Sequence, residues 1–156
     1  MKSIEDLLEP FSGYLDLGMY LEAHEELENL PEEAKAHPWA ALARLTLLLE
    51  TGGWQEGIRL GSESSRKWPQ EHEFYFKTAY CLHELKRTEE AKQTLETAPD
   101  AIRKTALFHY NLACYETQLG NIETAKHLLK RCFALAPAYK EEANEDPDLQ
   151  PLWDWL

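Results

Sequence analysis

The fold of this chain is decided by the stretch at residues 110–137, YNLACYETQLGNIETAKHLLKRCFALAP. It predicts two helices separated by the turn-forming pair Gly120-Asn121, with Pro137 ending the second helix. A single helical hairpin cannot bury its own apolar face. The stretch therefore predicts further hairpins of the same kind elsewhere in the chain.

A repeat of 34 residues runs through the sequence without an insertion. Small residues recur at that spacing, where two helices are expected to cross closely: Ala23, Gly57, Ala91 and Ala125. Five residues before each of them lies a position expected to turn the chain between the helices: Gly18, Gly52, Lys86 and Gly120. The sequence therefore predicts four related hairpins.

This pattern resembles the tetratricopeptide repeat, a helix–turn–helix unit of 34 residues with small residues at fixed positions. The resemblance implies an all-α fold, a right-handed superhelical solenoid of four repeats with a C-terminal capping helix. We expect a single domain over residues 1–156. Its repeats are expected at about 4–37, 38–71, 72–105 and 106–137, followed by a cap at 138–156.

The C-terminal part extends the resemblance. The segments NLACY at 111–115 and DPDLQPLW at 146–153 are similar to segments of a group of small bacterial tetratricopeptide proteins. That resemblance implies a bacterial, cytoplasmic protein but no particular activity.

Composition narrows the partners. The chain has 156 residues, 44% of them apolar, and contains no Val, which favours a helical domain with a core of its own. Its formal charge of −12 disfavours nucleic acid and anionic membranes, which are bound through Lys and Arg. The three cysteines follow no disulfide pattern, and the acidic N-terminus lacks the features of a signal peptide. These features predict a cytoplasmic protein without a cofactor.

Local signals predict how individual helices begin and end. Ser3 and Asp6 form a candidate capping box, whereas Pro10 and Gly13 are expected to kink or split the first helix. Residues 32–37 are expected to form a polar connector, and residues 138–145 a polar helix. The first helix of the fourth repeat is expected to start at Asp100 at the earliest and to end at Gln118.

The last residues are predicted to close the solenoid. Asp146 is expected to cap a short final helix with Pro147 in its first turn. One face of that helix is expected to pack over the last repeat through Leu149, Leu152, Trp153 and Leu156, while Trp155 points away.

By analogy with the tetratricopeptide family, the first helix of each repeat lines the concave side of the solenoid. The positions that face this groove form the candidate peptide-binding site: Trp39, Leu42, Thr46, Leu49, Phe76, Lys77, Tyr80, His83, Tyr110, Asn111 and Cys114. Exposed aromatic rings and amides suit a peptide ligand. The alternative is that Phe76, Tyr80 and Tyr110 merely fill a tight superhelix.

One known variant of the fold binds the acidic C-terminus of heat-shock chaperones through Lys and Asn. The corresponding positions here hold Lys77 as their one cation, and Glu73 would repel a carboxylate. The sequence therefore argues against that ligand and favours an apolar or unlike-charged segment.

Catalysis and metal binding find little support in the sequence. Cys114 with His83 or His109 could form part of a nucleophilic site, but the sequence shows no third group that would orient the histidine. The same residues lack the spacing that recurs in zinc sites. We therefore predict no enzyme, no catalytic residue and no metal site.

Three functional hypotheses follow. The first is an interaction module that binds a peptide or helix of another protein in the groove. The second is a type III secretion-like chaperone for an apolar client. The third and most distant is an enzyme or metal protein using Cys114, His83 and His109. The sequence is compatible with a monomer or a weak homodimer formed through the N-terminal hairpin or the C-terminal tail.

Overall fold

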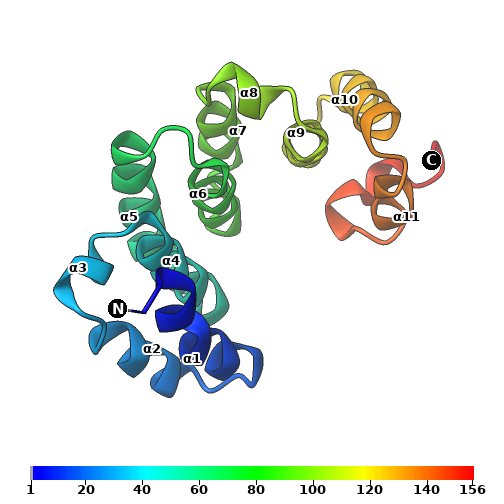
Figure 1. Cartoon of the computed structure of the whole chain (residues 1–156). Helices are drawn as coiled ribbons and strands as arrows, with labels where there is room; N and C mark the ends of the chain where they lie inside the picture. Colours follow the sequence, from blue (N-terminus) through cyan, green and yellow to red (C-terminus); the bar gives the residue numbers. More distant parts are fainter. Residues whose placement is uncertain (1) are drawn as a thin grey trace. The chain divides into compact units, whose positions relative to one another are not determined.

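A computed structural model describes residues 2–156, and this part of the chain consists of helices, turns and loops without a β-strand. The chain divides into two compact units, Met1–Lys77 and Thr78–Leu156. Figure 1 labels the α-helices in chain order. The division falls inside α6 (His72–Glu84).

The first unit is built from helical hairpins. Its helices before α6 are α1 (Ile4–Asp16), α2 (Tyr20–Glu28), the single turn α3 (Glu32–Lys35), α4 (Pro38–Thr51) and α5 (Trp54–Lys67). Helix α1 packs on both α2 and α4, and α4 packs on α5. Their shared core includes Phe11, Leu27, Leu30, Ala43 and Leu47.

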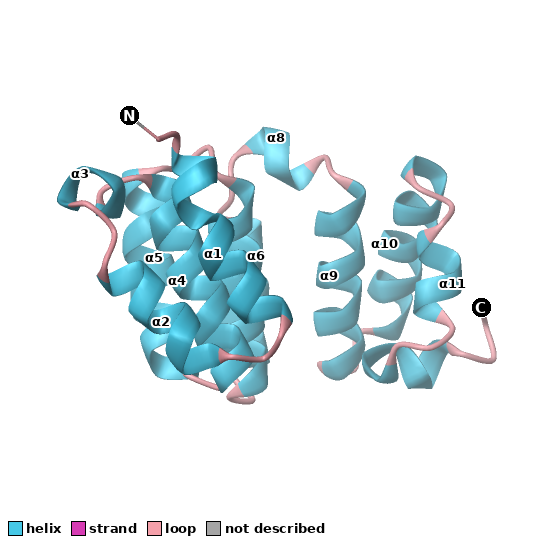
Figure 2. Cartoon of the chain, turned by 60° about the horizontal axis from the view of Figure 1, so that its bottom comes forward, coloured by secondary structure: helices cyan, strands magenta, loops and turns pink. Residues whose placement is uncertain are grey.

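The second unit continues the pattern from the C-terminal half of α6. It contains α7 (Thr88–Glu96), α8 (Asp100–Arg103), α9 (Ala106–Gln118), α10 (Ile122–Leu135), α11 (Tyr139–Ala143) and the 3₁₀-helix η1 (Pro147–Leu152). Figure 2 shows α9 and α10 side by side, with α11 next to α10. An ion pair between Lys92 Nζ and Glu116 Oε1, 2.8 Å apart, joins α7 to α9.

The predicted repeat agrees with the structure at both of its marker positions. The small residues Ala23, Ala91 and Ala125 are fully buried, and Gly57 is buried as well. The turn positions have left-handed backbones, with φ of 70° at Gly18, 75° at Gly52, 63° at Lys86 and 85° at Gly120. A left-handed residue after a helix redirects the chain, and glycine adopts this conformation without a steric cost.

Two predicted helix starts are confirmed by their side-chain caps. Ser3 Oγ accepts a hydrogen bond from the Asp6 amide at 3.1 Å. Asp146 Oδ1 accepts one from the Asp148 amide at 2.9 Å, and Pro147 stands in the first turn of η1. The final element is therefore capped as predicted, although it is a 3₁₀-helix.

The expected interruption of the first helix is wrong in its stronger form. Helix α1 runs from Ile4 to Asp16 with Pro10 inside it, so the helix is not split. Pro10 and Asp6 are both exposed, so water can satisfy the Asp6 carbonyl that loses its amide donor. The buried Phe11 ring holds the helix on the core.

Other predicted boundaries also need correction. Residues 32–37 contain the helical turn α3, and the predicted helix at 100–118 is two helices. It is broken because Thr105 Oγ1 accepts a hydrogen bond from the Phe108 amide at 3.2 Å and so caps a new helix. Helix α11 is shorter than the predicted 138–145.

Within residues 2–156, each helix is too short or too polar to cross a bilayer.

Candidate functional site

The predicted groove positions of the first unit differ in their exposure. Trp39 is 41% exposed, and its ring meets the His37 ring edge-on with centroids 5.5 Å apart. Leu42, Thr46 and Leu49 on α4 are half-buried. Phe76 is 7% exposed and therefore belongs to the core rather than to an open groove. Lys77 lies 3.5 Å from the Glu73 carboxylate, which offsets its charge.

The predicted positions of the second unit fall into two groups. Tyr80 is 44% exposed, and His83 and Asn111 are half-buried. Tyr110 and Cys114 are each only 5% exposed. Phe76, Tyr110 and Cys114, expected to line an open groove, are therefore buried. In the second unit, the C-terminal segment covers Tyr110 and Cys114.

Asp146 covers the middle of α9. The Tyr110 hydroxyl donates a hydrogen bond to Asp146 Oδ2 at 2.7 Å, and the Cys114 thiol approaches the same oxygen at 3.7 Å. The other carboxylate oxygen caps η1. One side chain therefore shapes the C-terminal segment and attaches it to two predicted groove residues.

Asp148 makes the second attachment. Its Oδ2 lies 3.2 Å from His83 Nε2, and its backbone carbonyl accepts a hydrogen bond from Gln118 Nε2 at 2.8 Å. The other imidazole nitrogen, His83 Nδ1, lies 2.9 Å from Thr88 Oγ1, and the ring packs on Tyr115 with centroids 5.1 Å apart. The imidazole is thus fixed from three sides and directed at the carboxylate.

These contacts set the charges of the site. The hydrogen bond from His83 lowers the pKa of Asp148, and the charges of His83 and Lys86 act in the same direction. Burial, followed by the nearby Asp146 carboxylate, raises the pKa of both Tyr110 and Cys114. At neutral pH the Asp148 side chain is therefore an anion, whereas Tyr110 and Cys114 are neutral donors.

Two leucines anchor the same segment. Leu149 and Leu152 are 0% and 1% exposed, and η1 packs on α9. The predicted four-residue face is wrong for Trp153, which is exposed and donates a hydrogen bond from Nε1 to the Ala143 carbonyl at 3.1 Å. Trp155 is exposed as expected, with Lys126 Nζ 5.7 Å from its ring centre.

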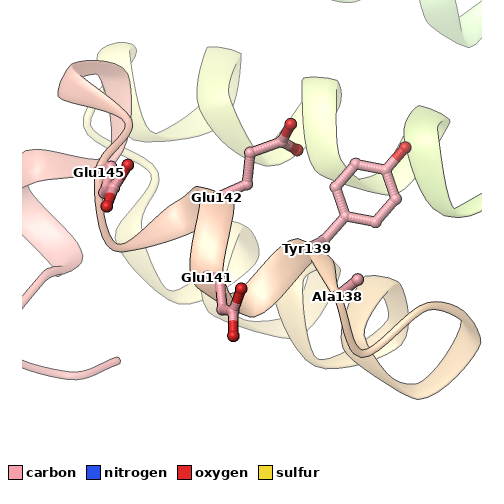
Figure 3. A pocket seen from close by; sticks show the side chains of 5 residues that line it. All are labelled: Ala138, Tyr139, Glu141, Glu142 and Glu145. Atoms are coloured by element: carbon pink, nitrogen blue, oxygen red, sulfur yellow. The ribbon is translucent and has the colours of Figure 1, made fainter.

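A cavity lies beside this attachment, between α9 and α11. It has a volume of about 430 Å³ and is lined by Leu107, Tyr110, Asn111, Tyr139, Glu142, Glu145 and Asp146. The Tyr110 and Tyr139 rings are 5.1 Å apart in a tilted pair. A second cavity of about 470 Å³ shares Tyr139, Glu142 and Glu145 with it (Figure 3). The lining combines aromatic rings, one amide and several carboxylates.

A family model of the tetratricopeptide repeat matches residues 72–100 and 106–139. The chain contains tetratricopeptide repeats. The two matched segments begin 34 residues apart, the spacing read from the sequence. Their helices, α6 with α7 and α9 with α10, carry His83, Tyr110 and Cys114.

Several solved structures share this fold. MamA 41-end from Desulfovibrio magneticus RS-1 is similar with a TM-score of 0.73 at 16% identity, covering 97% of this chain and 89% of that one. A MamA RS-1 ArsTM double mutant gives 0.69 at 14% identity, covering 92% and 79%. MamA from MSR-1 gives 0.67 at 19% identity, covering 88% and 79%. No curated protein sequence gives a significant match. These likenesses establish an all-α tetratricopeptide solenoid fold.

His83 and Cys114, two residues of the catalytic or metal-binding hypothesis, have structural partners within the second unit. His83 bonds with Thr88 and Asp148, and Cys114 approaches Asp146, so the two side chains serve one segment. The ligand atoms of Cys114, Asp146 and Asp148 lie within 4.8 Å of one another. Burial raises the pKa of Cys114, which opposes the thiolate that metal binding or nucleophilic attack requires.

His109, the other residue of that hypothesis, is buried beside Phe108, with ring centroids 5.5 Å apart. Burial and the Arg131 charge lower its pKa, so the imidazole is neutral at physiological pH. Its surroundings are those of a packing residue.

Sequence reasoning missed the acidic side of the site. The sequence predicts only a capping role for Asp146 and gives no signal that Asp148, Tyr139, Glu142 and Glu145 lie at the site. The sequence Asp-Pro-Asp at 146–148 could have indicated this role, because two carboxylates two residues apart can bind different donors.

Proposed function

We propose that this chain is a protein-interaction module and that the second unit binds a peptide segment of a partner along α9 and the end of α6. The observation that carries the proposal is the seating of the C-terminal segment on this face. His83, Tyr110 and Cys114, all predicted to face a ligand, contact residues 146–148. Gln118 binds the same segment. This surface is therefore suited to hold a short segment of polypeptide.

The contacts have the chemistry of peptide recognition. Gln118 binds a backbone carbonyl, which any peptide offers, whereas His83 and Tyr110 bind side-chain carboxylates, which only some peptides offer. Two leucines of the segment are buried. Backbone bonds, selective polar contacts and apolar anchors together supply affinity and specificity.

The proposal also includes the compartment, the class of partner and the oligomeric state of the protein. Three buried cysteine thiols suit a reducing compartment, and we assign the protein to the bacterial cytoplasm. A net charge of −12 supports a protein partner over nucleic acid or an anionic membrane. We propose a non-enzymatic module without a cofactor, a monomer or a weak homodimer.

Site-specific photo-crosslinking in the source organism tests this function. A photoreactive residue at Tyr80, which is 44% exposed at the predicted groove, should cross-link a defined partner. The matched control carries the same residue at Gln93, an exposed position on α7. Adding Asn111→Ala to the Tyr80 probe should reduce the yield. Equal cross-linking from both positions would remove the proposal.

Exposed positions are required for this experiment. Alanine at the buried Phe76 or Tyr110 would open cavities and destabilise the fold by about 3–5 kcal/mol, so lost binding would be ambiguous.

A chaperone for an apolar client is a second candidate. It is favoured by the exposed apolar residues Leu17, Met19 and Leu21 at the turn between α1 and α2. Co-expression with an aggregation-prone client tests it. The wild-type chain should keep the client soluble, and a Leu17→Ser, Leu21→Ser variant should fail. A client that precipitates equally with the wild-type chain excludes this role.

A further inference from the structure

We infer that residues 146–152 are a built-in ligand of the second unit. The site selects a segment with two carboxylates two residues apart followed by buried leucines, and a partner segment of this chemistry must displace the chain's own. The inference rests on the proposed function, since it names the ligand class and the regulation of the same face.

Each part of the segment has its own recognition group. Asp146 accepts a hydrogen bond from Tyr110 at 2.7 Å, and Asp148 lies 3.2 Å from the His83 imidazole. Gln118 holds the peptide carbonyl between Asp148 and Leu149 at 2.8 Å. Leu149 and Leu152 follow and are buried. The segment thus offers two carboxylates followed by two leucines, and its polar groups contact α9 and the end of α6.

This chemistry revises the ligand favoured by the sequence. Lys77 and Glu73 alone argued against carboxylates. They belong to the first unit, however, whereas the donors His83, Tyr110 and Gln118 all belong to the second. None of these three donors is a lysine. Carboxylates can therefore be bound here without the cations that the chaperone-binding variant of the fold uses.

The attachment is suited to exchange. The side chains of Asp146 and Asp148 are half-buried, and the exposed residues Pro147, Gln150, Pro151 and Asp154 alternate with the anchoring ones. Hydrogen bonds between the segment and α9 come from side chains rather than from a shared backbone ladder. The segment follows α9, α10 and α11 in the chain, so its release leaves the hairpin of α9 and α10 connected.

Competition with a labelled peptide tests the inference in the full chain. The probe is a fluorescent peptide of residues 144–156, and its binding is followed by anisotropy. The wild-type chain should bind it weakly because its own segment fills the site. A full-length Asp146→Ala, Asp148→Ala, Leu149→Ala variant should bind it at least about ten-fold more tightly, since the fraction of open sites sets the apparent affinity.

Two controls make the result specific. Asp154→Ala removes an exposed carboxylate of the same segment and should leave peptide binding at the wild-type level. Adding His83→Ala and Gln118→Ala to the released variant should weaken peptide binding at least about ten-fold again, because each removed group makes a specific polar contact. Circular dichroism verifies the helical content of every variant.

A purely structural cap gives a different outcome. In that case the released variant, although folded, does not bind the peptide, or it binds no better than the wild-type chain, and either result overturns the inference. If the triple variant unfolds, Asp148→Asn replaces it, since that change keeps both leucines and Asp146. It should still raise peptide affinity, and an unchanged affinity is again a refutation.

The test is separable from that of the proposed function. If Tyr80 cross-links a partner but the released variant does not bind the tail peptide, the proposed interaction module is supported and the inference of a built-in ligand is refuted. Tail-peptide binding controlled by Asp148 and His83 would support the inference.

Discussion

Asp148 concentrates the polar chemistry of the C-terminal segment in one residue. Its carboxylate lies against the His83 imidazole, its carbonyl binds Gln118 and its amide completes the cap of η1. The hydrogen bond from His83 lowers the pKa of this carboxyl below its ordinary value of 3.8. A group with a lowered pKa stabilises the folded state in its charged form.

The stability contributed by Asp148 should therefore depend on pH. It should be fully present above pH 3.8, the unfolded value, and be lost as the pH falls below that value through the lower folded pKa. Urea unfolding of the wild-type chain and of Asp148→Asn between about pH 2.5 and about pH 7, a range that brackets the carboxyl pKa, measures this contribution. The difference between the two proteins should shrink toward the acid end. Asp154→Asn should show no such trend, and a difference that grows on acidification contradicts the assignment.

Tyr110 allows one hydrogen bond to be isolated. Tyr110→Phe keeps the ring but leaves Asp146 Oδ2 with only the distant Cys114 thiol. We expect the free energy of unfolding to fall by about 1–2 kcal/mol, as for a buried bond to a charged acceptor. Tyr20→Phe, at an exposed tyrosine, should change it by less than about 0.5 kcal/mol. Equal effects of the two changes would mean that the Tyr110–Asp146 bond contributes nothing.

The cysteines offer a test of reactivity. Cys81, Cys114 and Cys132 are buried thiols, and burial raises the pKa of Cys132 to about 11 and that of Cys114 well above its usual range. We expect the native protein to resist an aromatic disulfide reagent at pH 8 and to react fully in denaturant, because thiolate and access are both required. Rapid modification of one native thiol would reopen the enzyme hypothesis.

At the scale of elements, the four hairpin turns share a left-handed backbone conformation but not the same residue type. Gly18, Gly52 and Gly120 occupy the left-handed region, and Lys86 occupies it with φ of 63°. A residue with a Cβ atom is strained in this conformation by roughly 1–2 kcal/mol. The turn between α6 and α7 therefore stores strain that the other turns avoid.

Replacing Lys86 by glycine should relieve this strain. We expect Lys86→Gly to raise the free energy of unfolding by up to about 1 kcal/mol, and Gly120→Ala, at φ of 85°, to lower it by about the same amount. Thermal unfolding compares both with the wild-type chain. A loss of stability in Lys86→Gly would mean that the lysine side chain stabilises the fold by more than the strained backbone destabilises it.

At the scale of the whole molecule, the net charge of −12 opposes the compact state. Most ion pairs among the described residues join positions three or four apart on one helix and are exposed, so solvent screening leaves each of them only a small contribution to stability. The pair between the half-buried Lys92 and the buried Glu116, which joins two helices, is the clearest exception in the described chain. Repulsion should therefore outweigh the surface pairs.

Salt should accordingly stabilise the protein. Raising sodium chloride from low to about 0.5 M reduces the Debye length to a few ångströms and screens the excess negative charge. We expect the midpoint of thermal unfolding to increase. Sodium chloride and potassium chloride at equal ionic strength should act alike, and a lower midpoint in either salt would show that the ion pairs dominate.

The sequence by itself determined most of the helices, their 34-residue repeat and the positions of the turns, including the one at Lys86. These features are local or periodic, since small residues, glycines and prolines mark helix crossings and ends wherever they occur. The broken helix at Thr105 and the intact helix at Pro10 were missed because capping and solvent access vary from place to place.

Only the tertiary structure decided which predicted groove residues are covered. Tyr110 and Cys114 bind a carboxylate 36 and 32 positions further along the chain, and His83 binds one 65 positions away. Such pairings leave no periodic trace in one sequence, because they depend on where the C-terminal segment folds back. The sequence predicted which helices carry these residues, but the burial of Leu149 and Leu152 and the polar contacts of residues 146–148 with α6 and α9 are visible only in the tertiary structure.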